Sequence, residues 1–406
     1  MKVAIVHDWL VAPGDAEKVL EQIIACFPEA DLFSLVDFLE DRKLLGGRPV
    51  TTSFIQHLPF ARHRYRTYLP LMPRAIAQFD LSAYDLVITN SHTVAKGVPV
   101  APHQIHVSYV HSPMRCAWDL QHNYLRDARL TRGPKSWAAR TALHYLRGWD
   151  ARSTNGVDRL IANSHFGARR VMKTYRRDAA VIAPPVNVHR FELRASKDDF
   201  YLSASSMVSY ERIDLIVETF NASPQRKLVV IGDGPQMAAI RAKAGSNVTM
   251  LGAQPFEVLK DHLQRARAFV FAAEEDLGIV PLEAQACGTP VIAFGKGGAL
   301  EAVVPVGEPH PTGVYYAQQT VASMLAAIER FERLSERITP TACRANAERF
   351  SAAIFRRAFM AEVTRTIAAA GVRQRLDGAP RGERDLATTQ DLGWRDEAAP
   401  KSSGGG

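Results

Sequence analysis

The sequence lacks the marks of several protein classes. Its four cysteines lie far apart and form no CxxC pair, which excludes a disulfide framework and a zinc ribbon; they are Cys26, Cys116, Cys287 and Cys343. The apolar run of residues 1–6 is too short for a signal peptide or a membrane span. Hydrophobic residues make up 47% and charged residues 23%, so neither a chain disordered throughout nor a multi-span membrane protein is expected. We therefore expect a protein of the reducing cytoplasm.

Acidic residues are scarce in one part of the chain. Residues 51–180 contain 19 Lys and Arg against 7 Asp and Glu, although the net charge of the whole chain is only +8. This local excess predicts an anionic partner. The segment 61–75 interleaves aromatic and apolar residues with four arginines: Arg62, Arg64, Arg66 and Arg74. It either lies on an anionic membrane or is a solvated basic face that packs its apolar side inward. No RNA-binding signature accompanies it, so we expect no nucleic acid partner.

Strand-length apolar runs alternate with amphipathic helical segments over most of the 406 residues. This pattern predicts an α/β fold with two doubly wound, Rossmann-like domains that face each other across a cleft. The predicted strands of the first series are 3–6, 86–89, 106–110 and 160–162, and those of the second are 201–203, 227–231, 248–251, 268–271 and 290–293. The predicted units are residues 1–188, residues 189–370 with a long closing helical pattern from about 319, and a disordered tail, 371–406.

Ligands of such domains bind where strand ends meet helix N-termini, so the strand-to-helix turns are the places to search. In the first turn, Gly14 lets backbone amides approach a phosphate. The alternative is an ordinary helix start, with Asp15 as the N-cap and Lys18 on the exposed face. A second glycine turn, residues 232–234, lacks the complete GxGxxG pattern, which favours tight turning over dinucleotide binding.

The most informative segment is 271–290. Three acidic residues, Glu274, Glu275 and Asp276, directly follow an apolar strand, and a turn at Gly278 then opens a helix that carries Glu283. A surface loop is the default interpretation of such acidic residues. At a strand end beside a helix N-terminus, however, free amides can bind a phosphate, and both glutamates can accept hydrogen bonds from hydroxyl groups. The segment therefore predicts a polyhydroxylated, phosphate-bearing ligand.

The chain from residue 1 to about 370 resembles the retaining, GT-B-fold glycosyltransferases of family 4, and among them the bacterial mannosyltransferase-like branch. The segments that carry the resemblance are 6–10, 16–19, 84–88, 111–115, 162–164, 210–214 and 275–283. The resemblance implies transfer of a hexose, mannose in the first place, from a nucleotide diphosphate sugar such as GDP-mannose, with retained configuration. The acceptor would be a glycan or a lipid-linked sugar in polysaccharide assembly, bound by the first domain, while the second binds the donor nucleotide. Such an enzyme would work in the cytoplasm or at the inner face of the cytoplasmic membrane.

The same resemblance implies roles for individual residues. His111 and Glu275 would be the catalytic residues at the donor sugar, and Glu283 would bind the ribose. The remaining donor-binding residues would be Gly14, Arg212, Gly278, Ile279 and Val280. The family implies no cofactor and no metal, and the sequence shows no metal-ligand cluster.

Three positions depart from the family pattern, and the resemblance implies that all three face the donor diphosphate. Asp15 stands where the family has Gly, Ser206 where it has Arg, and Glu211 where it has Lys. The net charge at the diphosphate position changes by −1 at Asp15, by −1 at Ser206 and by −2 at Glu211, which should weaken both binding and turnover. Either Arg212 or Lys296 replaces the missing cations, or the donor differs. The competing interpretation is an impaired GT-B pseudoenzyme that binds a sugar, a lipid or a partner protein.

Overall fold

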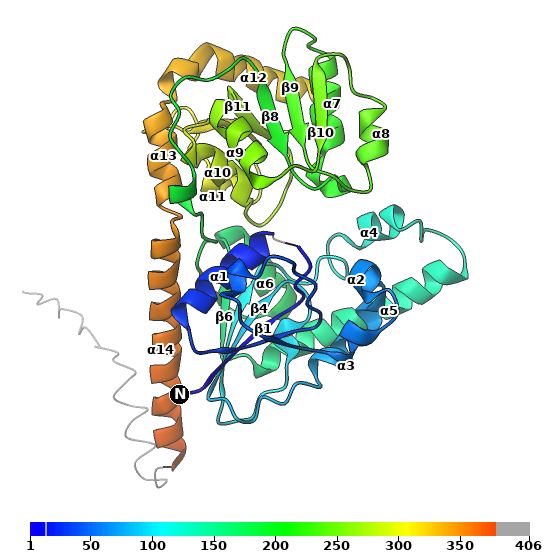
Figure 1. Ribbon diagram of the computed structural model, residues 1–406, viewed down its shortest axis with the longest axis vertical. Coiled ribbons are helices and arrows are strands. Elements are labelled where there is room, and N and C mark those ends of the chain that lie inside the picture. The colour runs from blue at the N-terminus through cyan, green and yellow to red at the C-terminus, as the bar shows by residue number, and fades with distance from the viewer. Residues whose placement is uncertain (13, 379–406) are drawn as a thin grey trace, which may run out of the picture.

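The computed structural model describes residues 1–12 and 14–378, with side chains to residue 371, and contains two α/β domains stacked along the long axis of the molecule (Figure 1). The predicted tail is outside the described residues from 379 onward. Its first part, 371–378, is helical, so the prediction of a disordered tail was wrong there. The helix continues there from the alanines of residues 368–370, and Arg373, Gln374, Arg375 and Leu376 are residues that favour helix.

The first domain is built on a seven-stranded parallel sheet with the order β3-β2-β1-β4-β5-β6-β7. Its strands are β1 (Val3–His7), β2 (Asp31–Ser34), β3 (Val50–Thr52), β4 (Leu86–Ser91), β5 (Ile105–Val110), β6 (Arg159–Ala162) and β7 (Ala179–Val181). Its helices are α1 (Asp15–Cys26), α2 (Ala61–Arg64), α3 (Met72–Ile76), α4 (Gln121–Asp127), α5 (Pro134–Ser153) and α6 (His165–Tyr175). Every residue of β4 is buried, as expected of a central strand covered on both faces.

The second domain contains a six-stranded parallel sheet with the order β10-β9-β8-β11-β12-β13. Its strands are β8 (Tyr201–Ala204), β9 (Leu228–Ile231), β10 (Val248–Gly252), β11 (Ala268–Phe271), β12 (Val291–Phe294) and β13 (Gly313–Tyr316). The helices that follow are α7 (Ile213–Asn221), α8 (Met237–Arg241), α9 (Phe256–Arg265), α10 (Ile279–Ala286), α11 (Ala299–Ala302), α12 (Val321–Leu334), α13 (Pro340–Glu348) and α14 (Ala352–Gly378).

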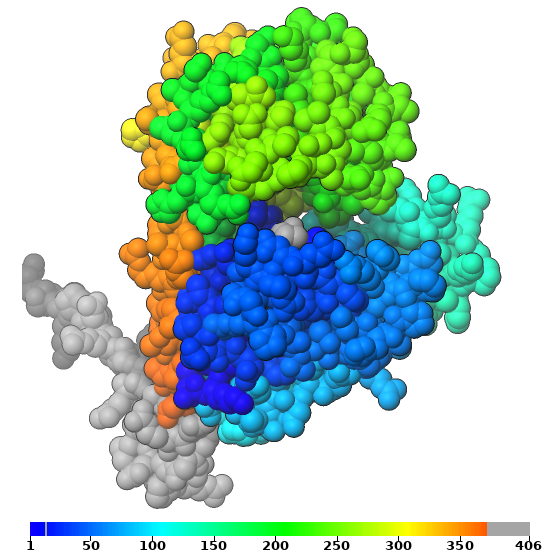
Figure 2. Space-filling model, in the orientation of Figure 1, coloured from blue at the N-terminus to red at the C-terminus, as the bar shows by residue number. Residues whose placement is uncertain are grey.

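Both sheets have the strand order of a doubly wound fold, which confirms the predicted architecture. The order reverses between β1 and β4 in the first sheet and between β8 and β11 in the second. A crevice forms at the carboxyl ends of the strands beside such a switch point. In the space-filling view the two domains leave a hollow between them (Figure 2). The turns after β1, β8 and β11 lie at this hollow, so the fold brings the motifs of the sequence together there.

Helix α14 returns to the first domain. Its residues Phe355, Phe359 and Val363 belong to the same buried cluster as Ile5 and Tyr109 of the first sheet. The helix runs along one side of that domain in Figure 1. We grouped this segment with the second domain from its helical pattern, which shows amphipathicity but not the domain on which the apolar face packs. The predicted boundary at residue 188 stays a prediction.

The chain therefore crosses between the domains twice, and the two crossings lie side by side. Val186 on the first crossing forms a parallel β-bridge with Ser351 on the second, and its amide donates to the carbonyl of Phe350 at 2.8 Å. Within residues 1–12 and 14–378, no helix combines the length and the hydrophobicity needed to cross a bilayer.

Candidate active site in the interdomain cleft

The acidic loop after β11 leads directly into helix α10. Gly278 is the N-cap of that helix, and no side chain caps it. The Glu275 carboxylate folds back over this position, because a Cβ added to Gly278 would lie 2.5 Å from its Oε1. Ile279 is buried and Val280 is half-buried in the first turn. The first turn of α10 thus presents unbonded amides to the cleft with a carboxylate beside them, as the sequence predicts.

Two glycines from the β12–α11 turn hold the acidic loop in place. Gly297 has a φ of 68°, and a Cβ there would lie 2.6 Å from the carbonyl oxygen of Glu275. A Cβ on Gly298 would lie only 2.0 Å from the carbonyl oxygen of Asp276. The Gly298 amide in turn donates to the Glu275 carbonyl at 2.8 Å. Only glycine fits at this close approach, so the turn fixes the backbone on which Glu275 stands.

Glu283 pairs with a residue of the other domain. The Nζ of Lys18 in α1 lies 2.6 Å from Oε1 of Glu283 in α10, and 3.6 Å from Oδ1 of Asp15. The Glu283 carboxylate is almost fully buried, whereas the Lys18 side chain is 39% exposed. The lysine therefore holds the carboxylate that the family resemblance assigns to the ribose. The sequence offers Lys18 on an exposed helix face only as one of two interpretations of this turn, and nothing in its own segment indicates a partner 265 residues away.

Three carboxylates converge in the cleft. Asp15 and Glu211 both act electrostatically on Glu275. Burial, followed by the charges of Glu211 and Asp15, raises the pKa of Glu275 well above its usual range. Burial also raises the pKa of Glu211 to about 7, although Arg115 and a hydrogen bond from Ser205 oppose this rise. Asp15 and Glu211, two of the three positions that depart from the family pattern, thus lie close enough to act on Glu275, the predicted catalytic glutamate. The third, Ser206, is exposed on the segment between β8 and α7.

The two cations considered as replacements at the diphosphate position are engaged elsewhere. The Nε of Arg212 lies 3.2 Å from Asp214, and its Nη1 donates to Gln319 at 3.4 Å. The Nζ of Lys296 lies 5.6 Å from the centre of the Phe294 ring. The Arg212 ion pair argues against the idea that this guanidinium replaces the missing cations. The arginine that acts on Glu275 and Glu211 is Arg115, which the sequence analysis did not single out.

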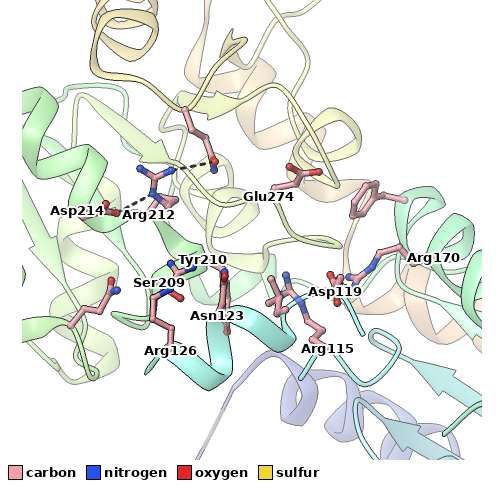
Figure 3. A pocket seen from close by; sticks show the side chains of 14 residues that line it. Arg115, Asp119, Asn123, Arg126, Arg170, Ser209, Tyr210, Arg212, Asp214 and Glu274 are labelled. Carbon is pink, nitrogen blue, oxygen red and sulfur yellow. Dashed lines mark hydrogen bonds and ion pairs between the residues drawn. The ribbon is translucent and has the colours of Figure 1, made fainter. Parts of the chain in front are cut away.

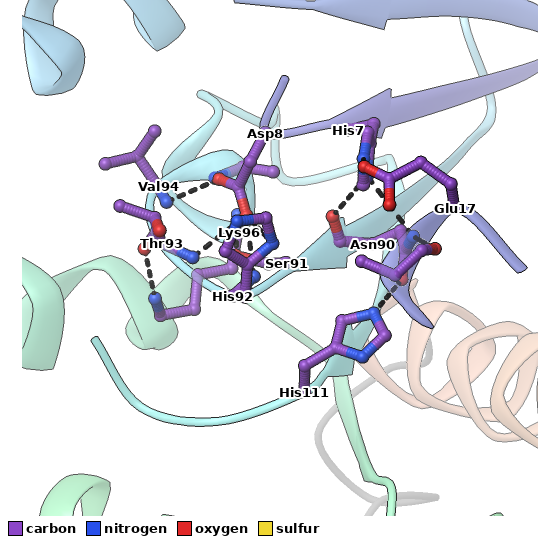
Figure 4. A network of polar contacts seen from close by, with 12 residues as sticks. His7, Asp8, Glu17, Asn90, Ser91, His92, Thr93, Val94, Lys96 and His111 are labelled. Atoms are coloured by element: carbon purple, nitrogen blue, oxygen red, sulfur yellow. Dashed lines mark hydrogen bonds and ion pairs between the residues drawn. The ribbon is translucent and has the colours of Figure 1, made fainter. Parts of the chain in front are cut away.

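His111 is held by a polar network within the first domain (Figure 4). Its Nε2 lies 2.7 Å from Oδ1 of Asn90, at the end of β4. The Asn90 backbone carbonyl lies 3.2 Å from Nδ1 of His7, whose Nε2 lies 3.2 Å from Glu17 in α1. Burial and the neighbouring His92 and His7 lower the pKa of His111 well below its usual range. The imidazole is therefore neutral at pH 7, and it is oriented by Asn90.

The same network explains the glycine at position 14 and the aspartate at position 8. A Cβ on Gly14 would lie 2.9 Å from Oε2 of Glu17, so a larger residue would displace the partner of His7. The buried Asp8 carboxylate accepts hydrogen bonds at 2.6 to 2.9 Å from the four backbone amides of residues 92–95. These contacts fix the turn after β4 beside His111.

Further polar contacts join the domains around the cleft. Arg170 in α6 lies 2.5 Å from Asp276 of the acidic loop and 2.6 Å from Asp119. Glu301 in α11 accepts hydrogen bonds at 2.9 Å from the amides of His165 and Phe166 at the start of α6. The carboxylate thus caps a helix of the opposite domain, where a negative charge is favourable. These contacts hold the domains in one relative position.

The remaining predicted segments also have defined environments. Residues 61–75 form α2, the 3₁₀ helix Tyr65–Leu71 and α3, which pack Tyr65, Met72 and Ile76 into the core and leave the four arginines exposed. Gly232 and Gly234 have φ values of 134° and 158°, and a Cβ on Gly232 would lie 1.9 Å from the carbonyl oxygen of Ser205. This second glycine turn packs against the β8–α7 segment, which agrees with a role in tight turning.

The match to a known family lies in the second domain. Residues 186–350 match the family "Glycosyl transferases group 1". A mannosyltransferase of Corynebacterium glutamicum, named as GDP-mannose-dependent and acting on a monoacylated phosphatidylinositol monomannoside, is 36% identical over 104 residues, or 23% of this chain and 27% of that protein. The D-inositol 3-phosphate glycosyltransferase of Segniliparus rotundus is 29% identical over 212 residues, or 44% of this chain and 46% of that protein. The chain thus spans less than half the length of these two relatives.

The structural comparison extends over both domains. Anabaena HepE, solved in complex with UDP and glucose, superposes with a TM-score of 0.66 at 17% identity, over 90% of this chain and 99% of HepE. An identity this low shows a common fold and no more. The chain therefore has the GT-B fold of glycosyltransferases, and its residues 186–350 match group 1 of these enzymes.

Proposed function

We propose that the protein is a glycosyltransferase that takes a hexose, mannose in the first place, from a nucleotide diphosphate sugar. GDP-mannose is the donor we favour, since the mannosyltransferase of C. glutamicum is named as GDP-mannose-dependent. The acceptor in this proposal is a glycan or a lipid-linked sugar in polysaccharide assembly.

The observation that carries the proposal is the loop and helix start at 275–283. Glu275 lies over the N-terminus of α10, and Glu283 follows one turn later, within the segment that matches group 1 glycosyl transferases. In the proposed reaction, the unbonded amides of Ile279 and Val280 bind the distal phosphate, and Glu275 accepts hydrogen bonds from the sugar. The ribose hydroxyls replace Lys18 as the partners of the Glu283 carboxylate. The freed Lys18 side chain then turns toward the phosphates.

The proposed chemistry retains the configuration at the anomeric carbon. The acceptor hydroxyl attacks the anomeric carbon from the side of the departing diphosphate, whose oxygen takes the hydroxyl proton. His111, neutral and held by Asn90, positions the sugar. No metal and no cofactor enters the proposal, since Lys18, Arg115 and the helix N-termini are the groups expected to face the departing charge.

The convergence of Asp15, Glu211 and Glu275 favours a second candidate. Three carboxylates beside a diphosphate repel it, so a pseudoenzyme that retains the fold for binding is the alternative. We also propose that the enzyme works at the cytoplasmic face of a membrane. Residues 61–75 pack their apolar side into the core, as in the interpretation of a solvated basic face, so this placement rests on the exposed arginines alone, which can face anionic headgroups.

Calorimetric titration of the protein with GDP-mannose, GDP, UDP-glucose and UDP tests the proposal. The enzyme is expected to bind one donor with micromolar affinity, and Glu275→Gln should retain nucleotide binding while sugar transfer to an acceptor extract is lost. The matched variant carries Asp15→Gly, Ser206→Arg and Glu211→Lys. If only this triple variant binds a donor, the protein retains the fold without the transfer reaction, and the alternative holds.

A further inference from the structure

One arginine of the segment 61–75 lies at the carboxyl edge of the first sheet. Trp9 stands two residues after β1, at the point where the strand order reverses. The guanidinium of Arg66 lies 6.0 Å from the centre of the Trp9 ring and 5.5 Å from that of Tyr65. Its Nε donates to the Tyr65 hydroxyl group at 3.1 Å. This hydrogen bond and the two rings hold the guanidinium beside the switch point.

The outer nitrogens of this guanidinium are free. Neither Nη atom of Arg66 forms a hydrogen bond or an ion pair with the residues that the structure describes. The nearby carboxylates of Asp8 and Glu17 have partners of their own, four backbone amides and the His7 ring respectively. The fork of an arginine matches the oxygens of a carboxylate or a phosphate. Arg66 therefore offers a binding group for an acid.

His92 stands beside Trp9 with one ring nitrogen free. It follows β4 directly, and its ring centre lies 4.4 Å from that of Trp9, edge to face. Its Nδ1 lies 3.1 Å from Oδ2 of Asp8 (Figure 4), whereas Nε2 has no hydrogen bond within residues 1–12 and 14–371. Burial lowers the pKa of His92, although the charge of Asp8 opposes this. The imidazole is neutral at pH 7, so with Nδ1 toward the carboxylate, Nε2 is a free acceptor for a hydroxyl group.

Trp9, Arg66 and His92, which we call the Arg66 corner, lie beside the proposed place of the donor sugar. The ring centres of His92 and His111 are 6.3 Å apart, and the proposed function assigns His111 to that sugar. These two histidines and Trp9 follow β1, β4 and β5, neighbouring strands whose carboxyl ends meet. An aromatic ring with a few polar groups beside it is typical of a small-molecule site.

The Arg66 corner is separate from the cavity between the domains. That cavity has a volume of about 610 Å³, and four arginines and three carboxylates line it (Figure 3). The three residues of the corner are not part of this lining. Ion pairs inside the cavity already use two of its arginines. Arg66 has no such pair in the described part of the chain, so an acid that binds there displaces nothing.

We propose that the Arg66 corner binds a sugar that carries an acid group, and that this sugar is the acceptor. Arg66 binds the acid group, and Nε2 of His92 accepts a hydrogen bond from a hydroxyl group of the same sugar. This inference rests on the proposed function, because it names the chemical class of the second substrate.

Matched pairs of methyl glycosides test the proposal. Each pair joins a uronide to its neutral parent: glucuronide with glucoside, galacturonide with galactoside, and mannuronide with mannoside. Mannose 6-phosphate is a further probe. Binding is followed by NMR from the ring carbon signals of His92, which are assigned by comparison with His92→Asn. We expect one acidic sugar to bind at least about tenfold more tightly than its neutral parent. A preference for mannose 6-phosphate over the uronides would identify the acid as a phosphate.

Two arginine variants locate the charge that is responsible. Arg66→Gln should reduce the affinity for the acidic sugar to that for the neutral parent, whereas Arg66→Lys should still prefer the acid. Arg64→Gln is the matched control, because Arg64 is also exposed but lies over the exposed ring of Phe60. We expect the control to weaken binding less than about twofold. Melting temperatures show whether each variant is folded.

Three results would overturn the proposal. These are equal affinities within every pair, equal losses in Arg66→Gln and Arg64→Gln, and His92 signals that no probe moves. The titration needs neither donor nor transfer, so it is judged apart from the proposed function. If a donor binds in calorimetry while the His92 signals stay unchanged, the proposed function stands and this inference falls. The reverse result keeps the acidic-sugar site and rejects the transfer reaction.

Discussion

Lys18 of the first domain and Glu283 of the second form an ion pair of 2.6 Å across the cleft. The pair links the first turn of α1 to the second turn of α10, so the N-terminal parts of both helices lie close together. A ligand that needs Glu283 must displace the lysine, and the displaced cation then lies beside the site where a phosphate would bind. Opening of the ion pair and binding of the donor are thus coupled through one carboxylate.

A double-mutant cycle measures this ion pair. Lys18→Gln alone leaves the buried Glu283 carboxylate without its cation, so it should destabilise the protein more than the double variant with Glu283→Gln does. We expect an interaction free energy of about 1 kcal/mol or more, because the Lys18 side chain is partly exposed and partly screened. Chemical denaturation at pH 7 gives the four free energies of unfolding. Additive effects of the two substitutions would contradict the pairing.

Glu211 should make stability depend on pH. Its carboxyl group has a pKa of about 7 in the fold against an ordinary value of 4.5, so the folded state holds a proton that the unfolded state releases. The contribution of Glu211 to the free energy of unfolding therefore has a negative slope against pH. It is highest below pH 4.5, falls as the pH rises, and is lowest above pH 7. The loss is about 3 kcal/mol at most.

The variant Glu211→Gln removes this titration. Its free energy of unfolding should equal that of the wild type near pH 5 and exceed it at pH 8, measured by urea denaturation at both values. Glu218→Gln is the control. Glu218 lies in helix α7, which follows Glu211, and its carboxylate pairs with Lys243 at the surface. A difference between wild type and Glu211→Gln that does not change with pH would show that the carboxyl group does not titrate in this range.

The contact between His111 and Asn90 should determine the protonation of the imidazole. Asn90→Asp places a carboxylate 2.7 Å from Nε2 and should raise the pKa of His111 by about 1 to 3 units. Titration of the ring carbon signals by NMR, assigned by comparison with His111→Gln, follows this change. Asn221→Asp adds the same charge on the second domain, where Asn221 bonds to residues 243 and 245, and should leave the pKa of His111 unchanged.

Gly298 should tolerate no side chain. The Cβ of Gly298→Ala would lie 2.0 Å from the carbonyl oxygen of Asp276, so the acidic loop has to move. We expect a loss of about 2 kcal/mol or more in stability and weaker donor binding. Gly156→Ala is the control, because its nearest contact is Cγ2 of Val100 at 3.4 Å, an ordinary distance. Equal melting temperatures for the two variants would show that the β12–α11 turn does not support the loop.

Local patterns in the sequence predict much of the fold. The central strands β4 and β11 are short apolar runs bounded by turns, and hydrophobic burial on both faces leaves them few alternatives. The strands β2, β3, β7 and β13 were not predicted, because polar, alanine or glycine residues such as Asp31, Thr51, Ala179 and Gly313 leave no continuous apolar run in them. The helical pattern from 319 was predicted as one long element, but it is broken at residues 335–339 and again before Ala352.

The candidate site was predictable where its chemistry lies within one turn of the chain. Glu275, Gly278 and Glu283 share one strand-to-helix connection, so their proximity follows from local geometry. The partners Lys18 and Arg115 were missed, because each acts across the cleft on residues far away in the sequence. Side-chain reach between two domains depends on how the sheets face each other, which no local pattern specifies.

The position of α14 bears on how the protein folds during its synthesis. Phe355, Phe359 and Val363 complete the buried cluster around Ile5 and Tyr109, so the first domain lacks part of its core until residues 355–363 have left the ribosome. The second domain is contiguous from β8 to α13 and can form earlier. The first domain is therefore translated first and completed last, and in the interval the apolar face that α14 later covers stays exposed.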